Sequence, residues 1–194
     1  MGEKAYRFHH AMVRDAAYAL LAEAERVTLH RLAGEYLEAR SEPDSLVLAE
    51  HFVRGGEPLR AAPHYLRAGE ESYEANDMAA TLYSAKRGLA CGVGGELRGA
   101  LLSLMVAACT WHEQYSEVVM LGTEALDLLP EGTKRWCRSM GHVCIAAGAT
   151  GQAALVVELA SRFACVEPSP DARGEYVRGA TWFASVLCVT GERG

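Results

Sequence analysis

The sequence has little that favours β-structure. No segment alternates strictly between apolar and polar residues, and no Asn-Gly or Asp-Gly pair marks a two-residue hairpin. Aromatic residues make up only 8% of the 194 residues, whereas alanine is abundant. Because alanine is the best helix former and aromatic residues favour strands, this composition predicts an all-α fold.

Positive charge is also scarce. The formal net charge is −6, and the sequence pI is about 5.7. Proteins that bind nucleic acids normally carry a basic face, because contacts to phosphates supply much of their affinity. The basic cluster at 134–138 is short. We therefore expect no nucleic-acid partner for this segment.

Long apolar runs are missing as well. No stretch approaches the roughly 20 apolar residues that a membrane-spanning helix needs. The N-terminal residues 1–7 do not lead into the apolar core of a signal peptide. The sequence predicts a cytoplasmic protein without a membrane partner.

The motifs of common enzymes and metal sites do not occur. The sequence lacks a Gly-x-x-x-x-Gly-Lys-Ser/Thr loop, a His-Glu-x-x-His pair and a Gly-x-Ser-x-Gly elbow. Seven histidines leave an acid–base or metal role open, but packing or capping between helices is the better interpretation. The carboxylates Glu70, Glu71 and Glu74 share one predicted helix, where a solvated face is usual. We expect no catalytic residues, no cofactor and no metal.

Six cysteines occur, and none forms a Cys-x-x-Cys pair or a zinc-ligand spacing with histidine. Each lies in an apolar helical pattern, where a free cysteine behaves as a small hydrophobic residue. Disulfides or metal ligation are the alternatives. The pattern favours six reduced, buried thiols, at positions 91, 109, 137, 144, 165 and 188.

What the sequence does have is helical periodicity. Leu29, Leu32, Ala33, Tyr36 and Leu37 follow the i, i+3, i+4, i+7, i+8 spacing of one buried helix face. Gly, Pro, Asn and Asp clusters divide the rest of the chain into segments of helical length. The predicted helices are 10–21, 24–39, 45–54, 58–75, 78–90, 96–113, 115–129, 132–148, 152–165 and 171–189.

An internal repeat links the later helices. Residues 118–130 align without gaps on 156–168, an offset of 38, and at this offset Gln114 matches Gln152. This period lies between the tetratricopeptide value of about 34 and the HEAT range of about 40–47. It predicts antiparallel helix pairs stacked as a right-handed, tetratricopeptide-like superhelical solenoid. The small residues Ala85, Gly122 and Ala160 are expected where helices cross closely.

The N-terminal region carries a further pattern, Phe-x-His-x-x-x-Arg-x-x-x-Tyr, formed by Phe8, His10, Arg14 and Tyr18. It resembles the segment that follows the ATPase core in bacterial STAND-type signal-transduction ATPases and in kinase-linked, LuxR-type or maltose-regulator-like proteins. The resemblance continues through shorter segments of the chain, at 25–31, 48–56 and 61–69.

The resemblance implies a division of the chain and a function. Residues 1–40 would form a helical linker or cap after an upstream ATPase core, and 41–194 would form tetratricopeptide-like repeats with the last one truncated. The implied function is a non-catalytic scaffold that binds a protein or peptide partner, or other domains of a larger bacterial signalling or transcription regulator. The alternative is a domain that senses a small-molecule or peptide effector and controls an upstream ATPase or kinase.

One candidate binding site follows from the repeat. Trp136 and Arg138 lie 40 residues before Tyr176 and Arg178, so adjacent repeats would present paired aromatic rings and paired guanidinium groups. Such a groove suits an acidic peptide or a carboxylate, since guanidinium groups bind carboxylates with two hydrogen bonds. Alternatively, both arginines are solvated and both rings fill gaps between helices. The other tryptophans, Trp111 and Trp182, are expected in the core.

Overall fold

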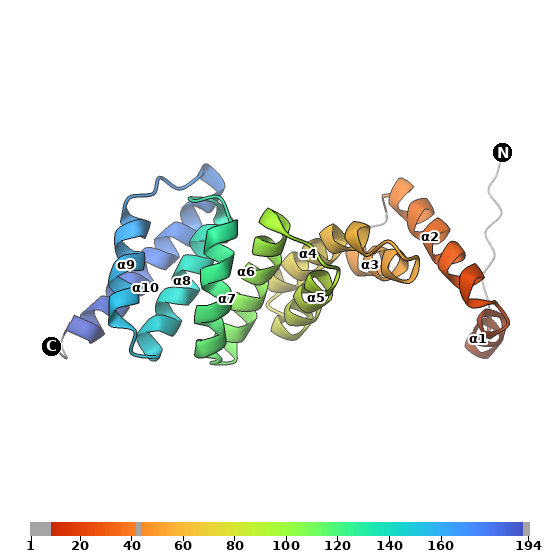
Figure 1. Ribbon diagram of the computed structural model, residues 1–194, viewed down its shortest axis with the longest axis horizontal. Coiled ribbons are helices and arrows are strands. Elements are labelled where there is room, and N and C mark those ends of the chain that lie inside the picture. Colours follow the sequence, from red (N-terminus) through yellow and green to blue (C-terminus); the bar gives the residue numbers. More distant parts are fainter. Residues whose placement is uncertain (1–8, 42–43, 192–194) are drawn as a thin grey trace.

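The computed structural model describes residues 9–41 and 44–191, and within these residues the chain is all-α (Figure 1). Phe8 of the N-terminal pattern and residues 42–43, between the second and third predicted helices, lie outside this part. The α-helices are α1 (Ala11–Ala19), α2 (Glu23–Ala39), α3 (Ser45–Arg54), α4 (Pro58–Glu74), α5 (Met78–Ala90), α6 (Gly95–Trp111), α7 (Tyr115–Leu128), α8 (Lys134–Ala149), α9 (Ala153–Ala164) and α10 (Arg173–Gly191). A short 3₁₀ helix, η1 (Pro170–Ala172), precedes α10.

The helices pack in chain order, and Figure 1 shows them as an extended row from α1 to α10. From α2 onward each helix contacts the next one along the chain. The even-numbered helices α4, α6, α8 and α10 also contact one another in succession, while α5, α7 and α9 each bridge two of them. The even-numbered helices therefore form one continuous layer, an arrangement consistent with stacked helical repeats.

The repeat in the sequence is visible in the backbone. Tyr115 and Ala153, the first residues of α7 and α9, are 38 positions apart. Gln114 and Gln152 precede these helices with nearly the same dihedral angles, φ −81° and ψ 54° against φ −85° and ψ 60°. The residue before each glutamine has a positive φ, 58° at Glu113 and 73° at Gly151. The same turn is thus built twice, once with glycine and once without it.

Small residues allow close helix contacts, as the repeat predicted. A Cβ atom added to Gly122 on α7 would collide with Cγ2 of Val143 on α8. Ala85 is completely buried, and Ala160 is half-buried against the largest core cluster. A further close contact, which the repeat did not reveal, lies between α8 and α10, where a Cβ at Gly141 would approach Trp182 to 2.6 Å.

The cysteines divide into two groups. Cys91, Cys109, Cys137 and Cys144 are buried, and all six cysteines are free of disulfides. Burial raises the pKa of Cys137 to about 11 and that of Cys144 to about 12. The prediction of burial is wrong for Cys165 and Cys188, which are exposed because one caps the end of α9 and the other lies near the end of α10.

Two further observations concern residues 9–41 and 44–191. There, no group of three or more His, Cys, Asp or Glu side chains is arranged to hold a metal ion. No helix in the same part of the chain is long and apolar enough to cross a membrane.

Candidate functional site

Two adjoining hollows lie on the layer of even-numbered helices. The arginine hollow, of about 320 Å³, is lined by residues that include Glu70, Tyr73, Glu74, Lys134, Arg135 and Arg138. The tryptophan hollow, of about 530 Å³, is lined by residues that include Tyr73, Trp111, His142, Ile145, Arg178 and Trp182. Tyr73, Glu74 and Lys134 line both hollows. The two therefore meet and form one groove along α4, α6, α8 and α10.

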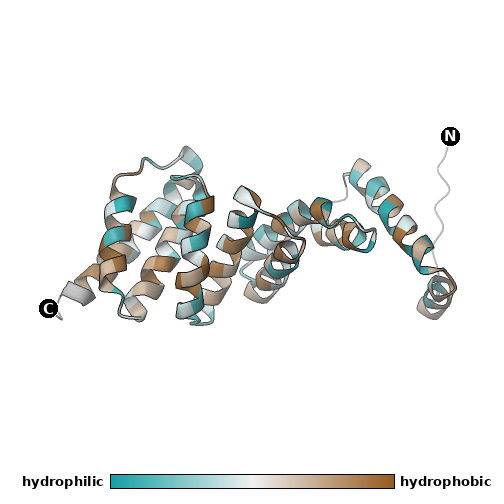
Figure 2. Cartoon of the chain, in the orientation of Figure 1, coloured by the Kyte–Doolittle hydropathy of each residue, from teal (hydrophilic) through white to brown (hydrophobic). Residues whose placement is uncertain are grey.

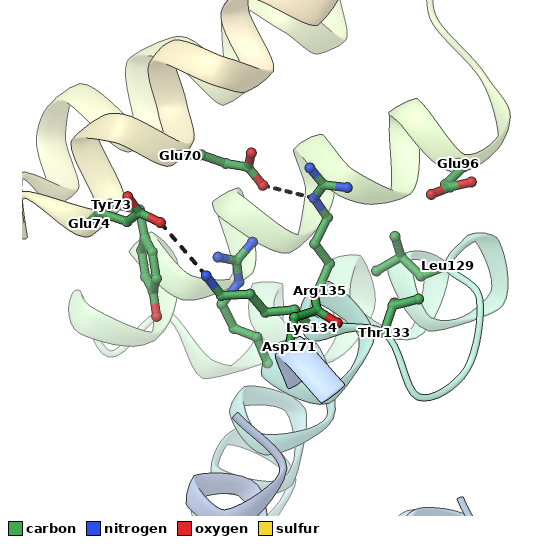
Figure 3. A pocket seen from close by; sticks show the side chains of 10 residues that line it. Glu70, Tyr73, Glu74, Glu96, Leu129, Thr133, Lys134, Arg135 and Asp171 are labelled. Atoms are coloured by element: carbon green, nitrogen blue, oxygen red, sulfur yellow. Dashed lines mark hydrogen bonds and ion pairs between the residues drawn. The ribbon is translucent and has the colours of Figure 1, made fainter. Parts of the chain in front are cut away.

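Most charges of the arginine hollow are paired (Figure 3). Arg135 Nε donates to Glu70 Oε1 over 2.8 Å, and Lys134 Nζ lies 3.7 Å from Glu74 Oε1. Glu96 and Asp171 also line the hollow, and both are exposed. The opening of the hollow is consequently rich in carboxylates.

Arg138 differs from Lys134 and Arg135, the other two cations of the arginine hollow. Only 4% of its surface is exposed, and its Nε and Nη2 donate to the same atom, Ser103 Oγ, over 3.2 and 3.1 Å. Its guanidinium carbon lies 4.6 Å from the centre of the Tyr73 ring. Within the described ranges it forms no ion pair with a carboxylate. Burial lowers the pKa of Arg138, but an arginine side chain stays protonated at neutral pH.

The tryptophan hollow is more apolar. Trp111 is 66% exposed at the end of α6, and Met78, Ala107 and Ile145 contribute further apolar walls. Arg178 Nη1 lies 3.5 Å from Glu175 Oε2 at the edge of this hollow. The hollow has the composition of a small-ligand pocket, with apolar walls and a few polar groups.

His142 lies at the base of the tryptophan hollow. It is buried, its ring centre lies 5.2 Å from that of Trp182, and neither ring nitrogen has a hydrogen-bond partner in the described structure. Burial, together with the positive charges of Arg138 and Arg178, lowers the pKa of His142 to about 3. The ring is therefore neutral at physiological pH, and its positive neighbours disfavour a metal cation there.

The four residues predicted to form one groove separate into two pairs. Arg138 and Arg178 line adjoining hollows of the groove. Trp136 and Tyr176 do not lie beside them as binding surfaces, because both stack on Phe163 of α9, with ring centres 6.1 and 4.4 Å away. Trp136 is completely buried by this stack, and Tyr176 is half-buried. For these two residues the alternative interpretation applies, in which the rings fill gaps between helices.

Sequence reasoning missed several residues of the groove. Tyr73 and Ser103 come from helices that the spacing of the repeat did not connect with Arg138. Trp111 and Trp182 were expected in the core, but both line the tryptophan hollow. One signal in the sequence could have indicated this: Trp111 lies at the end of a helix, and Trp182 lies in the last helix.

A second surface lies at the other end of the row. Apolar residues occur on both α1 and α2 (Figure 2), and α1 has no buried residue. The predicted buried face of α2 is confirmed only in part. Ala33 and Leu37 are half-buried, and Leu37 packs against the core of α3 and α4. Leu29, however, is 48% exposed, and Leu32 and Tyr36 are each 50% exposed. We refer to the α1–α2 apolar surface as the side chains of Met12, Leu20, Leu29, Leu32 and Tyr36.

Polar contacts connect this surface to the rest of the chain. The Tyr18 hydroxyl lies 2.9 Å from His30 Nε2, and His30 Nδ1 lies 3.1 Å from His51 Nδ1 on α3. Burial first, and then nearby positive charge, lowers the pKa of both histidines. The neutral rings thus join α1, α2 and α3 by hydrogen bonds rather than by charge.

No protein-family model, characterised protein or solved structure matches this chain at a significant level. The geometry of the groove and of the α1–α2 apolar surface is therefore the basis for the functional argument.

Proposed function

We propose that the protein is a non-catalytic helical-repeat scaffold that binds another protein or another domain of a larger bacterial signalling or transcription regulator. In this proposal the stacked pairs form a right-handed, tetratricopeptide-like superhelix, and the α1–α2 apolar surface is the docking surface. The proposed compartment is the cytoplasm, as expected from the sequence. The resemblance to STAND-type and related regulators supports a signalling or transcription regulator as the parent protein.

One observation carries the proposal. Leu29, Leu32 and Tyr36 have the helical spacing of a face that packs against something, yet the chain leaves about half of each side chain exposed. Met12 on α1 is 84% exposed, and Leu20, the residue directly after α1, is 87% exposed. Covering a large apolar side chain contributes about 1.5–3 kcal/mol, so a partner on this surface gains a favourable free energy from each residue.

The length of α1 supports the same conclusion. It has 9 residues and no buried side chain. Isolated helices shorter than about 12–15 residues are marginal in water, so contacts outside the helix must supply its stability. Tyr18 and its bond to His30 supply one such contact, and a docked domain would supply more.

Site-specific photo-crosslinking tests the docking surface. A photoreactive phenylalanine analogue replaces Leu32, which is 50% exposed on α2, in the full-length protein within its own cells. The matched control carries the analogue at Glu158, an exposed residue of α9 at the other end of the row. We expect one discrete product from position 32, in which mass spectrometry finds a second protein or another domain of the same parent chain.

The control and a variant complete the test. No such product should form from position 158. In a chain that carries the probe at Leu29, Leu32→Glu should abolish the crosslinked product with the partner. The thermal stability of the isolated chain should stay unchanged. Irradiation that yields no product from position 32, or only a product between two copies of this chain, overturns the proposal.

A specific observation favours effector sensing as a second candidate. The groove contains a buried, positively charged side chain beside an apolar hollow, a combination suited to a small ligand or a short peptide. In this candidate, occupation of the groove changes how α4, α6, α8 and α10 pack, and an upstream ATPase or kinase responds.

A further inference from the structure

Arg138 lines the arginine hollow and has N–H donors beyond those that bond to Ser103. A guanidinium group has five N–H donors, and the two bonds to Ser103 Oγ use only part of them. A buried charge without a charged partner is costly, and the ring of Tyr73 compensates only in part. Two carboxylates of the chain act on Arg138 electrostatically, but Glu70 is held by Arg135 at 2.8 Å and Glu175 lies 3.5 Å from Arg178. The group that would accept the remaining hydrogen bonds of Arg138 and pair with its charge is therefore an anion from outside the chain.

The carboxylates at the opening restrict which anion fits. Glu74, Glu96 and Asp171 line the arginine hollow, while Arg138 lies at its buried end. A ligand with several negative charges, such as a phosphate ester, would place charge near these side chains and be repelled. A single carboxylate needs only the two parallel hydrogen bonds that one guanidinium group offers.

The adjoining hollow indicates what the carboxylate is attached to. Tyr73 lines both hollows, so a ligand on Arg138 has a direct path toward Trp111 and Trp182. The charges along that path compensate each other, since Lys134 pairs with Glu74 and Arg178 pairs with Glu175. An uncharged apolar or aromatic body fits these walls, and a hollow of about 530 Å³ is large enough for it.

We propose that the groove binds a small monocarboxylic acid with an apolar or aromatic body, whose carboxylate bonds to Arg138 and whose body lies between Tyr73, Trp111 and Trp182. This inference rests on the effector-sensing candidate and is independent of docking at the α1–α2 apolar surface. The neutral ring of His142 lies at the base of the hollow and can exchange its contact with Trp182 for one with the ligand.

Titration calorimetry with three matched probes tests the inference on the full chain. The probes are 3-phenylpropionate, its uncharged amide 3-phenylpropionamide, and phenethyl phosphate, which carries the same ring on a dianion. We expect 3-phenylpropionate to bind, and each of the other two to bind at least about tenfold more weakly, a difference of about 1.4 kcal/mol.

Two variants and a control identify the groups involved. Arg138→Gln should lower the affinity for 3-phenylpropionate at least about tenfold, and Arg67→Gln, at an exposed arginine of α4 outside both hollows, should leave it unchanged. Trp111→Ala removes a side chain that is 66% exposed, so the fold should persist while affinity falls. This variant keeps the test valid if Arg138→Gln does not fold.

Several results overturn the inference. They are no binding of 3-phenylpropionate, equal affinity for the acid and the amide, tighter binding of phenethyl phosphate, or unchanged affinity in both Arg138→Gln and Trp111→Ala. Because crosslinking at Leu32 concerns the opposite end of the row, each proposal can fail while the other stands.

Discussion

The side chain of Val143 on α8 occupies the space that a Cβ atom on Gly122 of α7 would need. This contact joins two consecutive helices of the row, and Val143 belongs to its largest core cluster. Valine has a stiff side chain, so it cannot turn away from an added methyl group at low cost.

Gly122→Ala should therefore destabilise the fold by about 1–3 kcal/mol, the usual cost of overpacking a core. Gly174→Ala is the matched control, since a Cβ there meets no atom within 4 Å, and it should be neutral or slightly stabilising. Urea unfolding followed by circular dichroism measures both. The double variant Gly122→Ala, Val143→Ala should be less than additive, and full additivity would contradict the contact.

The repeated turn gives a prediction of opposite sign. Glu113 has a φ of 58°, a conformation that glycine adopts without strain, and its equivalent in the next repeat is Gly151. Glu113→Gly should stabilise the chain by about 0.5–1 kcal/mol. Gly151→Glu should destabilise it by a similar amount. Thermal unfolding of both variants shows whether their midpoints move in opposite directions, as the shared turn requires.

The thiols should react in two classes. Cys165 and Cys188 are exposed, whereas the other four are buried. The pKa of Cys137 is raised to about 11 and that of Cys144 to about 12, so neither forms a thiolate at neutral pH. A chromogenic disulfide reagent should modify two thiols of the native protein rapidly and the remaining four only after denaturation. Rapid reaction of Cys137 or Cys144 in native protein would show that the core opens.

The burial of His142 should make stability depend on pH. Its pKa is about 3 in the folded chain and near 6.5 when unfolded, so the unfolded state binds more protons between these values. The stability it contributes is complete above about pH 6.5 and is lost as the pH falls toward 3. His30 and His51, whose pKa values are also lowered, act in the same direction.

His142→Leu should remove this contribution. Between about pH 7 and pH 5 the variant should lose about 2 kcal/mol less stability than the original chain, because one buried titrating group is gone. The same substitution at His112, exposed at the end of α6, should leave the pH dependence unchanged. Urea unfolding at both pH values gives the comparison, and equal losses in both variants would contradict the role of His142.

Much of the fold could be predicted because its signals are local. The bounds of α3 and α5 agree with the sequence prediction, and both helices begin after an aspartate that caps them. Asp44 accepts hydrogen bonds from Leu46 N and Val47 N, and Asp77 accepts one from Ala80 N. The repeat likewise marked the turn at Gln114 and Gln152. Capping and turn chemistry depend on residues a few positions apart, which the sequence displays directly.

The site depended on contacts that the sequence does not display. The spacing of Arg138 and Arg178 placed them in corresponding turns, but whether a guanidinium group is buried depends on what packs over it. For Arg138 that is Tyr73 of α4 and Ser103 of α6, and for Trp136 it is Phe163 of α9. The exposure of Leu32 could not be predicted for the same reason. Apolar residues at helical spacing indicate a buried face, but they do not indicate whether the same chain or a partner buries it.

The succession of contacts between neighbouring helices also governs how the molecule deforms. The backbones of α4, α6, α8 and α10 approach one another in succession, while the ion pairs Arg135–Glu70 and Lys134–Glu74 also join α4 directly to α8. A bending force is shared among these interfaces, and curvature changes through small rotations at each. In the proposed complex, a ligand in the groove would contact α4, α6, α8 and α10 together and would oppose these rotations. The α2–α3 junction, joined by the hydrogen bond between His30 and His51, lies outside this set of interfaces. In this proposal the ligand therefore acts on the stretch from α4 to α10, while the α1–α2 apolar surface lies at the opposite end of the row.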